Sequence, residues 1–436
     1  MPAPSPLTLP RSLKFLVVGV LYFAEGIPFG FINTTLSFYM RGQGVPLEQI
    51  GVLSLLGLAW SLKFFWSPLA DRFGSRAAWL VPAQALIALC LVGLSLQANA
   101  PVTLGFWVLV GLLCLASATQ DLAVDAYSID LLETRELGLA NGIRNGAYRL
   151  GTLAAGAGLL ILSDRIGWSP AFVGVAVMMA AMVVTVLVFR PFHLPRPAEA
   201  RGAAPASGPL HQFRVALEGL RRHRHIGVIV LFTLLYKAGD ALMGSMVSPF
   251  WKDHGFSGTQ FVVVSGIFGA GATIVGGLLG GAFTSRCGIG RGLWVLGILQ
   301  AVSNLGYWVA ALPGMGRKVL FSLPYLGDWV PVYPIYLASQ GESLSAGLGS
   351  AAFMAFLMAL CDKRFSATQY AFFAMLFALS ARVMGYLGGW GAGWLGYAPF
   401  FFLTFLVSLP AFALLPWVLP VARQIENPGQ PSEVNR

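Results

Sequence analysis

Long runs of apolar residues recur along this chain of 436 residues, and short polar turns separate them. Most runs exceed the roughly 20 residues that an α-helix needs to cross the hydrocarbon core of a bilayer. The pattern predicts twelve spanning helices, at 13–40, 48–69, 77–97, 101–127, 139–163, 169–190, 226–251, 258–284, 291–312, 335–361, 366–388 and 398–420. We therefore expect an all-α, multi-pass membrane protein.

The longest polar stretch, 191–225, is rich in Pro, Ala and Arg and divides the predicted helices into two groups of six. We expect an N-terminal six-helix bundle at 1–190, a cytoplasmic loop at 191–225 and a C-terminal six-helix bundle at 226–436. Paired halves of this kind are typical of transporters whose site lies near the middle of the membrane.

The composition supports a membrane protein and excludes several other classes. Charged residues make up 11% of the chain, whereas a soluble domain carries about 25%. The basic residues that give the net charge of +10 are scattered over short loops, which argues against a nucleic-acid partner. The cysteines form no CxxC pair and the histidines all fall in loops, so we expect no metal, no cofactor and no membrane metalloenzyme.

The basic residues also predict the orientation, because Lys and Arg concentrate in cytoplasmic loops. With the N-terminus in the cytoplasm, the basic residues that fall in outer loops are only Arg41, Arg165, Lys252, Arg317 and Lys318. Both termini and the central loop are therefore expected to be cytoplasmic. A position on the membrane surface would suit the long outer loop 313–334, to which the sequence assigns no role.

Two carboxylates stand near the end of the fourth predicted span. Asp121 and Asp125 are four residues apart, so they share one face of a helix. A carboxylate at membrane depth costs roughly 2.5–3.5 kcal/mol to insert, and two like charges this close disfavour ionisation of both. An acid that keeps a proton near neutral pH inside a membrane is what a proton-coupled pathway needs. The alternative is that both acids lie in water at the cytoplasmic end of the helix.

The other charges inside the predicted spans avoid every third helix. They are Glu25, Lys63, Arg144, Arg149, Lys237, Asp240, Glu342 and Arg382. The third, sixth, ninth and twelfth spans carry no charge through their centres. This distribution fits a water-filled cavity that the other helices line.

In the first half, Glu25 precedes Pro28, and a break in the helix there would expose backbone groups to a substrate. Glu25 could instead be a helix-packing acid that pairs with a neighbouring Arg. Arg149 needs a counter-ion, for which Asp121 or Asp125 on the adjacent helix is the obvious candidate. We expect Arg144 to lie in water near the cytoplasmic end of its helix. Lys63 is not included among the candidate site residues, because its side chain can reach the membrane interface.

In the second half, Lys237 and Asp240 are three residues apart and either neutralise each other or leave Lys237 to anchor a carboxylate. Glu342 and Arg382 could pair between their helices, as structure or as a gate. In the ninth span, Gln300 and Asn304 share one face, while Ser303 and Tyr307 share another. These polar groups suit either hydrogen bonding between helices or recognition of a sugar.

The loop after the second span reads Ser67-Pro68-Leu69-Ala70-Asp71-Arg72-Phe73-Gly74-Ser75-Arg76. It resembles the major facilitator signature Gly-x-Leu-Ala-Asp-Arg-x-Gly-Arg-Lys, with Ser67 in place of the first Gly. The corresponding loop of the second half, 285–288, keeps Arg and Gly but lacks the Asp. The resemblance implies that a switch motif of Asp71, Arg72, Gly74 and Arg76 supports conformational change without binding substrate.

Five further motifs occur in order from the fourth to the eleventh span. They are Gln120-Asp121-x-x-x-Asp125-Ala126, Tyr148-Arg149-Leu150-Gly151, Tyr236-Lys237-x-Gly239-Asp240-Ala241, Gln300-x-x-Ser303-Asn304-x-Gly306-Tyr307-Trp308 and Phe365-Ser366-Ala367-Thr368-Gln369. Together they resemble the motifs of the AmpG-type muropeptide permeases of the same superfamily. The resemblance implies a major facilitator fold and a bacterial inner-membrane importer that the proton gradient drives. We expect the protein to be a monomer. Its implied substrate is GlcNAc-1,6-anhydro-MurNAc, with or without a peptide stem.

The chemistry of that substrate agrees with the residues in the spans. A large, anionic, hydroxyl-rich ligand needs cations, aromatic faces and amide donors. The expected substrate site therefore holds Gln120, Tyr148, Arg149, Lys237, Asp240, Asn304, Tyr307, Glu342 and Arg382. The expected proton-coupling acids are Asp121 and Asp125 first, and Glu25 second.

Other functions remain as alternatives. The same fold could carry another bulky anion, such as a siderophore or acetyl-CoA, and competition by unlabelled ligands would separate these. A membrane-embedded enzyme would need a nucleophile and a base, but histidine is missing from every predicted span. A lipid scramblase would need a lateral groove and no proton gradient, and a sensor would hardly need charges distributed over both halves.

Overall fold

The structure is a computed structural model that describes residues 10–63, 66, 76–132, 137–188, 226–325, 328–360 and 366–426. Within these ranges, eleven helices are long and apolar enough to span a membrane: Arg11–Gly42, Ala77–Leu96, Leu104–Ser128, Gly146–Ile166, Trp168–Val188, Ile226–Asp253, Gly258–Cys287, Ile289–Ala310, Pro334–Ala359, Phe372–Leu395 and Tyr397–Pro420. A shorter apolar helical segment, Leu47–Leu62, takes the place of the expected second span. The predicted multi-pass helical fold with about twelve helices is therefore confirmed.

The chain forms two compact units. Unit 1 comprises Met1–Val45, Leu56–Ala206 and Ser257–Val262, and unit 2 comprises Pro46–Leu55, Ser207–Phe256 and Val263–Arg436. The segment Ser257–Val262 falls in unit 1 because the Asp164 carboxylate accepts hydrogen bonds of 2.8 Å from both the backbone N–H and the hydroxyl of Thr259. The expected division at 191–225 stays a prediction, since that loop lies outside the described residues.

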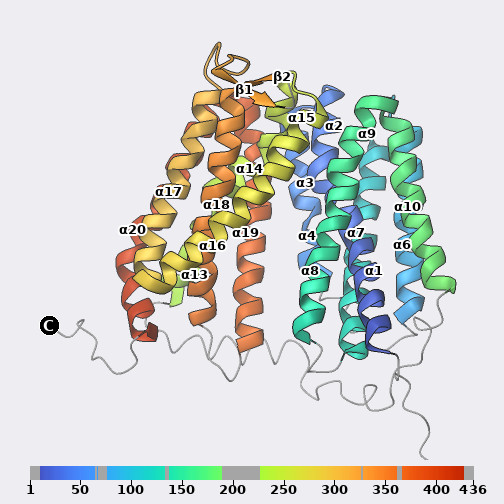
Figure 1. The fold of residues 1–436 in the computed structure, drawn as a ribbon, viewed down its shortest axis with the longest axis horizontal. Helices are drawn as coiled ribbons and strands as arrows, with labels where there is room; N and C mark the ends of the chain where they lie inside the picture. Colours follow the sequence, from blue (N-terminus) through green and yellow to red (C-terminus); the bar gives the residue numbers. More distant parts are fainter. Residues whose placement is uncertain are drawn as a thin grey trace, which may run out of the picture. The chain divides into compact units, whose positions relative to one another are not determined.

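Unit 1 is built from helices that surround the first span. Its elements are α1 (Arg11–Gly30), η1 (Phe31–Leu36), α2 (Ser37–Gly42), α4 (Leu58–Leu62), α6 (Arg76–Leu96), α7 (Leu104–Leu131), α8 (Leu137–Leu153), η4 (Ala154–Gly158), α9 (Leu159–Ile166), α10 (Trp168–Val188) and α15 (Gly258–Phe261). Helix α1 contacts both α7 and α8 (Figure 1). A buried cluster that includes Val17, Tyr22, Leu80 and Val124 fills the space between α1, α6 and α7.

Glycines allow α1 and α8 to approach closely. A Cβ atom on Gly26 would lie 2.2 Å from the Tyr148 carbonyl oxygen, and one on Gly151 would lie 2.1 Å from that of Phe23. No side chain fits at either position, so the two backbones touch through small residues, as membrane helices often do. This contact fixes the positions of the polar residues on both helices.

The first span is not broken at Pro28, which corrects one interpretation of the sequence. Helix α1 runs through Pro28 to Gly30 and passes directly into the π-helix η1. The helical hydrogen bonding resumes directly after the proline, because the N–H of Phe31 donates to the carbonyl oxygens of Ile27 and Pro28. A second π-helix, η4, lies beside η1, where its Ala155 and Gly156 carbonyl oxygens accept from the Thr35 hydroxyl at 3.2 and 2.9 Å.

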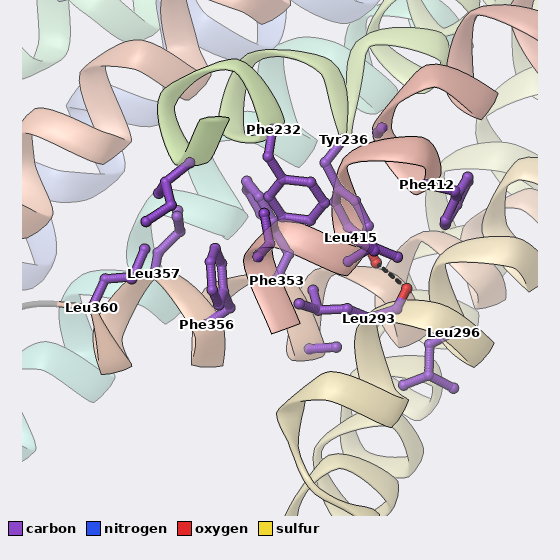
Figure 2. Packing of buried hydrophobic residues seen from close by; sticks show 14 of the residues in the cluster. Phe232, Tyr236, Leu293, Leu296, Phe353, Phe356, Leu357, Leu360, Phe412 and Leu415 are labelled. Atoms are coloured by element: carbon purple, nitrogen blue, oxygen red, sulfur yellow. Dashed lines mark hydrogen bonds between the residues drawn. The ribbon is translucent and has the colours of Figure 1, made fainter. Parts of the chain in front are cut away.

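Unit 2 contains the other spans and one hairpin. Its elements are α3 (Leu47–Leu56), α13 (Ile226–Leu235), α14 (Ala238–Asp253), η6 (Val262–Phe268), α16 (Gly269–Cys287), α17 (Ile289–Ala310), β1 (Phe321–Tyr325), β2 (Asp328–Val332), α18 (Pro334–Ala359), α19 (Ser366–Leu395) and α20 (Tyr397–Glu426). The aromatic core in Figure 2 joins α13, α17, α18 and α20. There Tyr236 stacks on Phe353, with ring centroids 5.0 Å apart, and its hydroxyl donates to the Leu293 carbonyl at 3.1 Å.

The seventh span is interrupted in the middle. Helix α13 ends at Leu235, and α14 begins at Ala238 after a turn at Tyr236 and Lys237. Lys237 has φ −110° and ψ 8°, outside the helical region. Discontinuous helices often mark transporter sites because they free backbone groups within the membrane. The break occurs here rather than at Pro28 in the first span.

The long loop between α17 and α18 contains the only strands among the described residues. Strands β1 and β2 pair antiparallel, with Phe321 opposite Val332 and Pro324 opposite Trp329. In Figure 1 the hairpin lies at one end of α17 and α18. The sequence indicated only a loop here, so the hairpin is an addition to the predicted all-helical fold.

Candidate functional site

Three acids from two helices meet inside unit 1 and form what we call the acidic cluster: Glu25, Asp121 and Asp125. Glu25 lies on α1, and both aspartates lie on α7. One carboxylate oxygen from each residue lies within 4.8 Å of those of the other two. Glu25 and Asp121 are each only 8% exposed. The alternative that both aspartates simply lie in water is therefore not supported for Asp121.

Two cations form ion pairs with the aspartates of this cluster, and one hydroxyl donates a hydrogen bond to Asp125. The Lys63 ammonium lies 2.5 Å from Asp121 Oδ2 and 3.2 Å from Asp125 Oδ2. Arg144 Nη2 lies 3.1 Å from Asp125 Oδ1, which also accepts a 2.8 Å hydrogen bond from the Tyr22 hydroxyl. The Arg144 guanidinium stacks over the Tyr22 ring at 4.6 Å. These contacts tie α1, α7, α8 and the end of α4 together.

Glu25 is the acid of the cluster without a cationic partner among the described residues. Its Oε2 atom is buried and has no hydrogen-bond partner in that part of the chain. With every group ionised, three carboxylates would face the two cations Lys63 and Arg144, which leaves one negative charge. A single bound proton makes the cluster neutral. The three carboxylates are close enough to hold a metal ion, and in this structure the Lys63 ammonium contacts both aspartates.

Two expectations about the cations are wrong. Arg149 does not approach the aspartates as their counter-ion: its side chain is exposed, and the partner of Asp125 is Arg144. Residues 144 and 149 are five apart and so face different directions on α8. Lys63 does not extend away to the interface, because both aspartates hold its ammonium.

Two further predicted residues lie near this cluster along the chain. Gln120 is fully buried, and neither atom of its side-chain amide has a hydrogen-bond partner among the described residues. Tyr148 is half-buried, and its ring lies 5.7 Å from that of Phe29. Substrate contacts for Gln120, Tyr148 and Arg149 stay predictions.

A second polar cluster surrounds the break in the seventh span of unit 2. The Lys237 ammonium donates to Gln300 Oε1 at 2.6 Å and to Ser350 Oγ at 3.0 Å, and it lies 3.6 Å from Asp240 Oδ2. The Gln300 amide nitrogen donates to the same Asp240 oxygen. Lys237 and Asp240 thus do pair, and Gln300 bridges them. Sequence reasoning placed Gln300 on a polar face but did not include it in the site.

The other predicted residues of unit 2 lie on α17, α18 and α19. Asn304 is fully buried one turn beyond Gln300, so the two share a face as the spacing indicated. The Tyr307 ring is also fully buried and lies 5.4 Å from that of Phe401, so in this conformation it packs within the unit. Glu342 and Arg382 are half-buried. The pairing of Glu342 with Arg382 and the substrate roles of these residues stay predictions.

The predicted switch motif lies almost wholly outside the described residues. Asp71, Arg72 and Gly74 fall there, and Arg76 is the first residue of α6. The role of the motif stays a prediction.

Comparisons with known proteins identify the family to which the chain belongs. Residues 18–327 match the Major Facilitator Superfamily model. The chain is 32% identical over 419 residues to the anhydromuropeptide permease of Escherichia coli K12, which covers 93% of this chain and 79% of the relative. It is also 27% identical over 417 residues to a putative transporter AmpG 4 of Rickettsia conorii, and that alignment covers 93% of this chain and 95% of the relative.

Solved structures with the same fold are more distant in sequence. A bacterial homologue of the human lysosomal transporter Spinster has a TM-score of 0.69 at 17% identity and covers 95% of this chain and 98% of its own. A POT family transporter in complex with 5-aminolevulinic acid has a TM-score of 0.65 at 15% identity, and the match covers 94% of this chain and 96% of the transporter. These likenesses establish the fold alone.

Proposed function

The chain belongs to the major facilitator superfamily and, within it, to the AmpG-type permeases, and from this premise we propose that it imports anhydromuropeptides across the bacterial inner membrane. The substrate is GlcNAc-1,6-anhydro-MurNAc with or without its peptide stem. Transport proceeds by alternating access, is driven by the proton gradient and needs no cofactor. Both termini face the cytoplasm, and the protein works as a monomer.

The acidic cluster is the observation that carries the proton coupling. Its three carboxylates and two cations leave one negative charge, and a membrane interior disfavours an uncompensated charge. Glu25 is the group that takes up the proton, because both aspartates already have cationic partners. This reverses the order of preference that the sequence indicated, in which the aspartates came first.

Release of the proton from Glu25 would then change the local electrostatics. The new carboxylate competes with Asp121 for the Lys63 ammonium, which now lies 2.5 Å from that aspartate. Because Lys63 also contacts Asp125, a shift of its ammonium loosens the connection between α4 and α7. The cluster thus links one protonation event to the packing of α1, α4 and α7.

The polar cluster of unit 2 supports recognition of an anionic, amide-rich substrate. Lys237 lies at the N-terminus of α14, where backbone N–H groups and the helix dipole favour negative charge. A substrate carboxylate takes the place of Asp240 beside Lys237, while Gln300 offers its amide to sugar or peptide groups. Asn304 extends the same polar face by one turn.

Competition binding to the purified protein tests the substrate class. Labelled GlcNAc-1,6-anhydro-MurNAc-tripeptide should bind, and unlabelled anhydromuropeptide should displace it. A ferric siderophore or acetyl-CoA, each of which is bulky but lacks the anhydro sugar, should not displace it at the same concentration. Displacement by either of those anions at the same concentration as by unlabelled muropeptide, or no saturable binding of the labelled muropeptide, would contradict the proposal.

A further inference from the structure

A cavity of about 470 Å³ opens on the side of unit 2 between α17 and α18. It lies within the range of roughly 300–1,000 Å³ that small-molecule sites occupy. Much of its lining is aliphatic and faces outward from spanning helices: Val302 is 47% exposed, Val309 38% and Leu337 50%. Exposed aliphatic side chains on a membrane helix contact lipid tails, so an acyl chain can enter this cavity directly.

The one hydroxyl in the lining requires no polar ligand. Ser303 donates to the Gln300 carbonyl at 2.7 Å and lies 2.7 Å from the Ser345 hydroxyl, which donates to it. Its hydrogen bonds are therefore made within the protein. Gly306 and Gly341 also line the cavity, and they add neither a polar group nor a side chain that would fill it. The cavity thus suits a hydrocarbon chain better than a sugar or a peptide.

Two cations belong to the segment that connects the cavity lining to β1. Met315 and Leu320 both line the cavity, and the exposed residues Arg317 and Lys318 lie between them in the chain. The Arg317 guanidinium is held in place by a 2.6 Å hydrogen bond to the Gly255 carbonyl and by the Phe256 ring at 5.1 Å. Basic residues are rare in the loops expected to be outer, so two adjacent ones need a reason.

The hairpin indicates that this end of the cavity lies at the level of the lipid head groups. Trp329 on β2 is 72% exposed, and Phe321 on β1 is 47% exposed. Exposed aromatic rings next to cations are typical of the membrane interface. A chain in the cavity would therefore have its head group beside Arg317 and Lys318.

We propose that this groove binds an anionic glycerophospholipid of the surrounding membrane. One acyl chain lies between α17 and α18, and the phosphate lies beside Arg317 and Lys318. Charge complementarity selects an anionic lipid over a zwitterionic one, since each basic residue near a membrane surface adds attraction for anionic lipid. This inference does not depend on the transported substrate.

Native mass spectrometry of the full chain can test the proposal. The protein is released from micelles that contain equal amounts of dioleoyl-phosphatidylglycerol and dioleoyl-phosphatidylcholine, and the retained lipids are counted. We expect phosphatidylglycerol to be retained in preference. Lys318→Gln should reduce that preference roughly fivefold, about 1 kcal/mol, while Arg165→Gln, a change of another exposed outer-loop cation, should leave it unchanged.

A second variant tests the chain-binding part separately. Gly341→Leu adds a side chain inside the cavity, where a Cβ atom would meet no atom within 4 Å, so the helix need not shift. It should reduce retention of both lipids. Gly271→Leu on α16, which has equal space at its Cβ and is not part of the lining, is the matched control and should behave as wild type.

Three results would overturn the proposal. The first is equal retention of both lipids by the wild-type protein, and the second is wild-type retention by both Lys318→Gln and Gly341→Leu. The third is displacement of the lipid by soluble glycerol phosphate at the same concentration, which would identify a site for a free anion instead of a membrane lipid. Circular dichroism and elution as a single species would establish that each variant is folded.

Discussion

The Lys63 ammonium lies 2.5 Å from Asp121 Oδ2 and 3.2 Å from Asp125 Oδ2, so one cation bridges two acids on α7. This bridge leaves Glu25, which faces the same two acids, without a cation of its own among the described residues. The pairing therefore distinguishes two kinds of acid in one cluster. The aspartates are the partners of the cations, and under the proposed function Glu25 is the group that exchanges the proton.

Replacing Glu25 by Gln should separate transport from coupling. The amide keeps the shape of the protonated acid but cannot release a proton, so accumulation driven by a pH gradient should fall at least tenfold. Exchange of labelled for unlabelled substrate should continue, since it needs no net proton movement. Counterflow and gradient-driven uptake measured on the same vesicles would check this. Glu48→Gln, a change of an acid on α3 outside the cluster, should retain both activities.

Lys63→Met should destabilise the protein because it leaves Asp121 and Asp125 with less positive charge. For this partly exposed pair we expect a loss on the order of 1–3 kcal/mol, seen as a lower thermal midpoint. Adding Asp121→Asn to Lys63→Met should recover part of that loss, because it removes the carboxylate left unpaired. Strictly additive effects of the two substitutions would show that the pair does not interact.

Lys237→Met should weaken substrate binding, but transport of the substrate that still binds should remain coupled to the pH gradient. The substitution removes the cation at the N-terminus of α14, and loss of a charged hydrogen-bond partner costs roughly 1.5–3 kcal/mol, or about 10- to 150-fold in Kd. Equilibrium binding of the labelled muropeptide measures this directly. Lys252→Met, at the other end of the same helix, should bind nearly as wild type, and an equal loss in both variants would indicate a nonspecific charge effect.

Gly26→Ala should impair folding far more than Gly146→Ala. At Gly26 the added Cβ would meet the Tyr148 carbonyl oxygen at 2.2 Å, so α1 and α8 would have to separate. At Gly146 nothing lies within 4 Å, and alanine there should even add roughly 0.5–1 kcal/mol through helix propensity. The two variants can be compared by the yield of folded protein and by the midpoint of thermal unfolding. Similar behaviour of both variants would mean that the close approach of α1 and α8 is not required.

The spans were predictable because a bilayer imposes a simple rule on sequence, a run of apolar residues of fixed length. The same rule made the acids of α7 conspicuous. It could not find the partner of Asp121, because Lys63 is 58 positions away and only the tertiary fold brings the two together. From the sequence, Arg149 rather than Arg144 was expected to pair with the aspartates, because helical spacing alone cannot show which of two arginines faces α7.

The break in the seventh span illustrates a second limit. Proline is the usual signal for a disrupted helix, so Pro28 suggested a break in the first span, yet η1 continues the helix there. Leu235-Tyr236-Lys237-Ala238 itself contains no proline or glycine, and at this turn the Lys237 ammonium donates to Gln300 and Ser350. Tertiary hydrogen bonds of this kind leave no local pattern. The sequence did mark Lys237 and Asp240 as unusual, and that signal was chemical rather than conformational.

Uptake of labelled GlcNAc-1,6-anhydro-MurNAc-tripeptide into proteoliposomes, with and without an acid-outside pH gradient, tests the central claim most directly. Wild-type protein should concentrate the muropeptide only when the gradient is present, and Glu25→Gln should only equilibrate it. Gradient-driven accumulation by Glu25→Gln at the wild-type level would contradict the assignment of Glu25 as the proton carrier. Absence of uptake by folded wild-type protein under either condition would contradict the proposed transport itself.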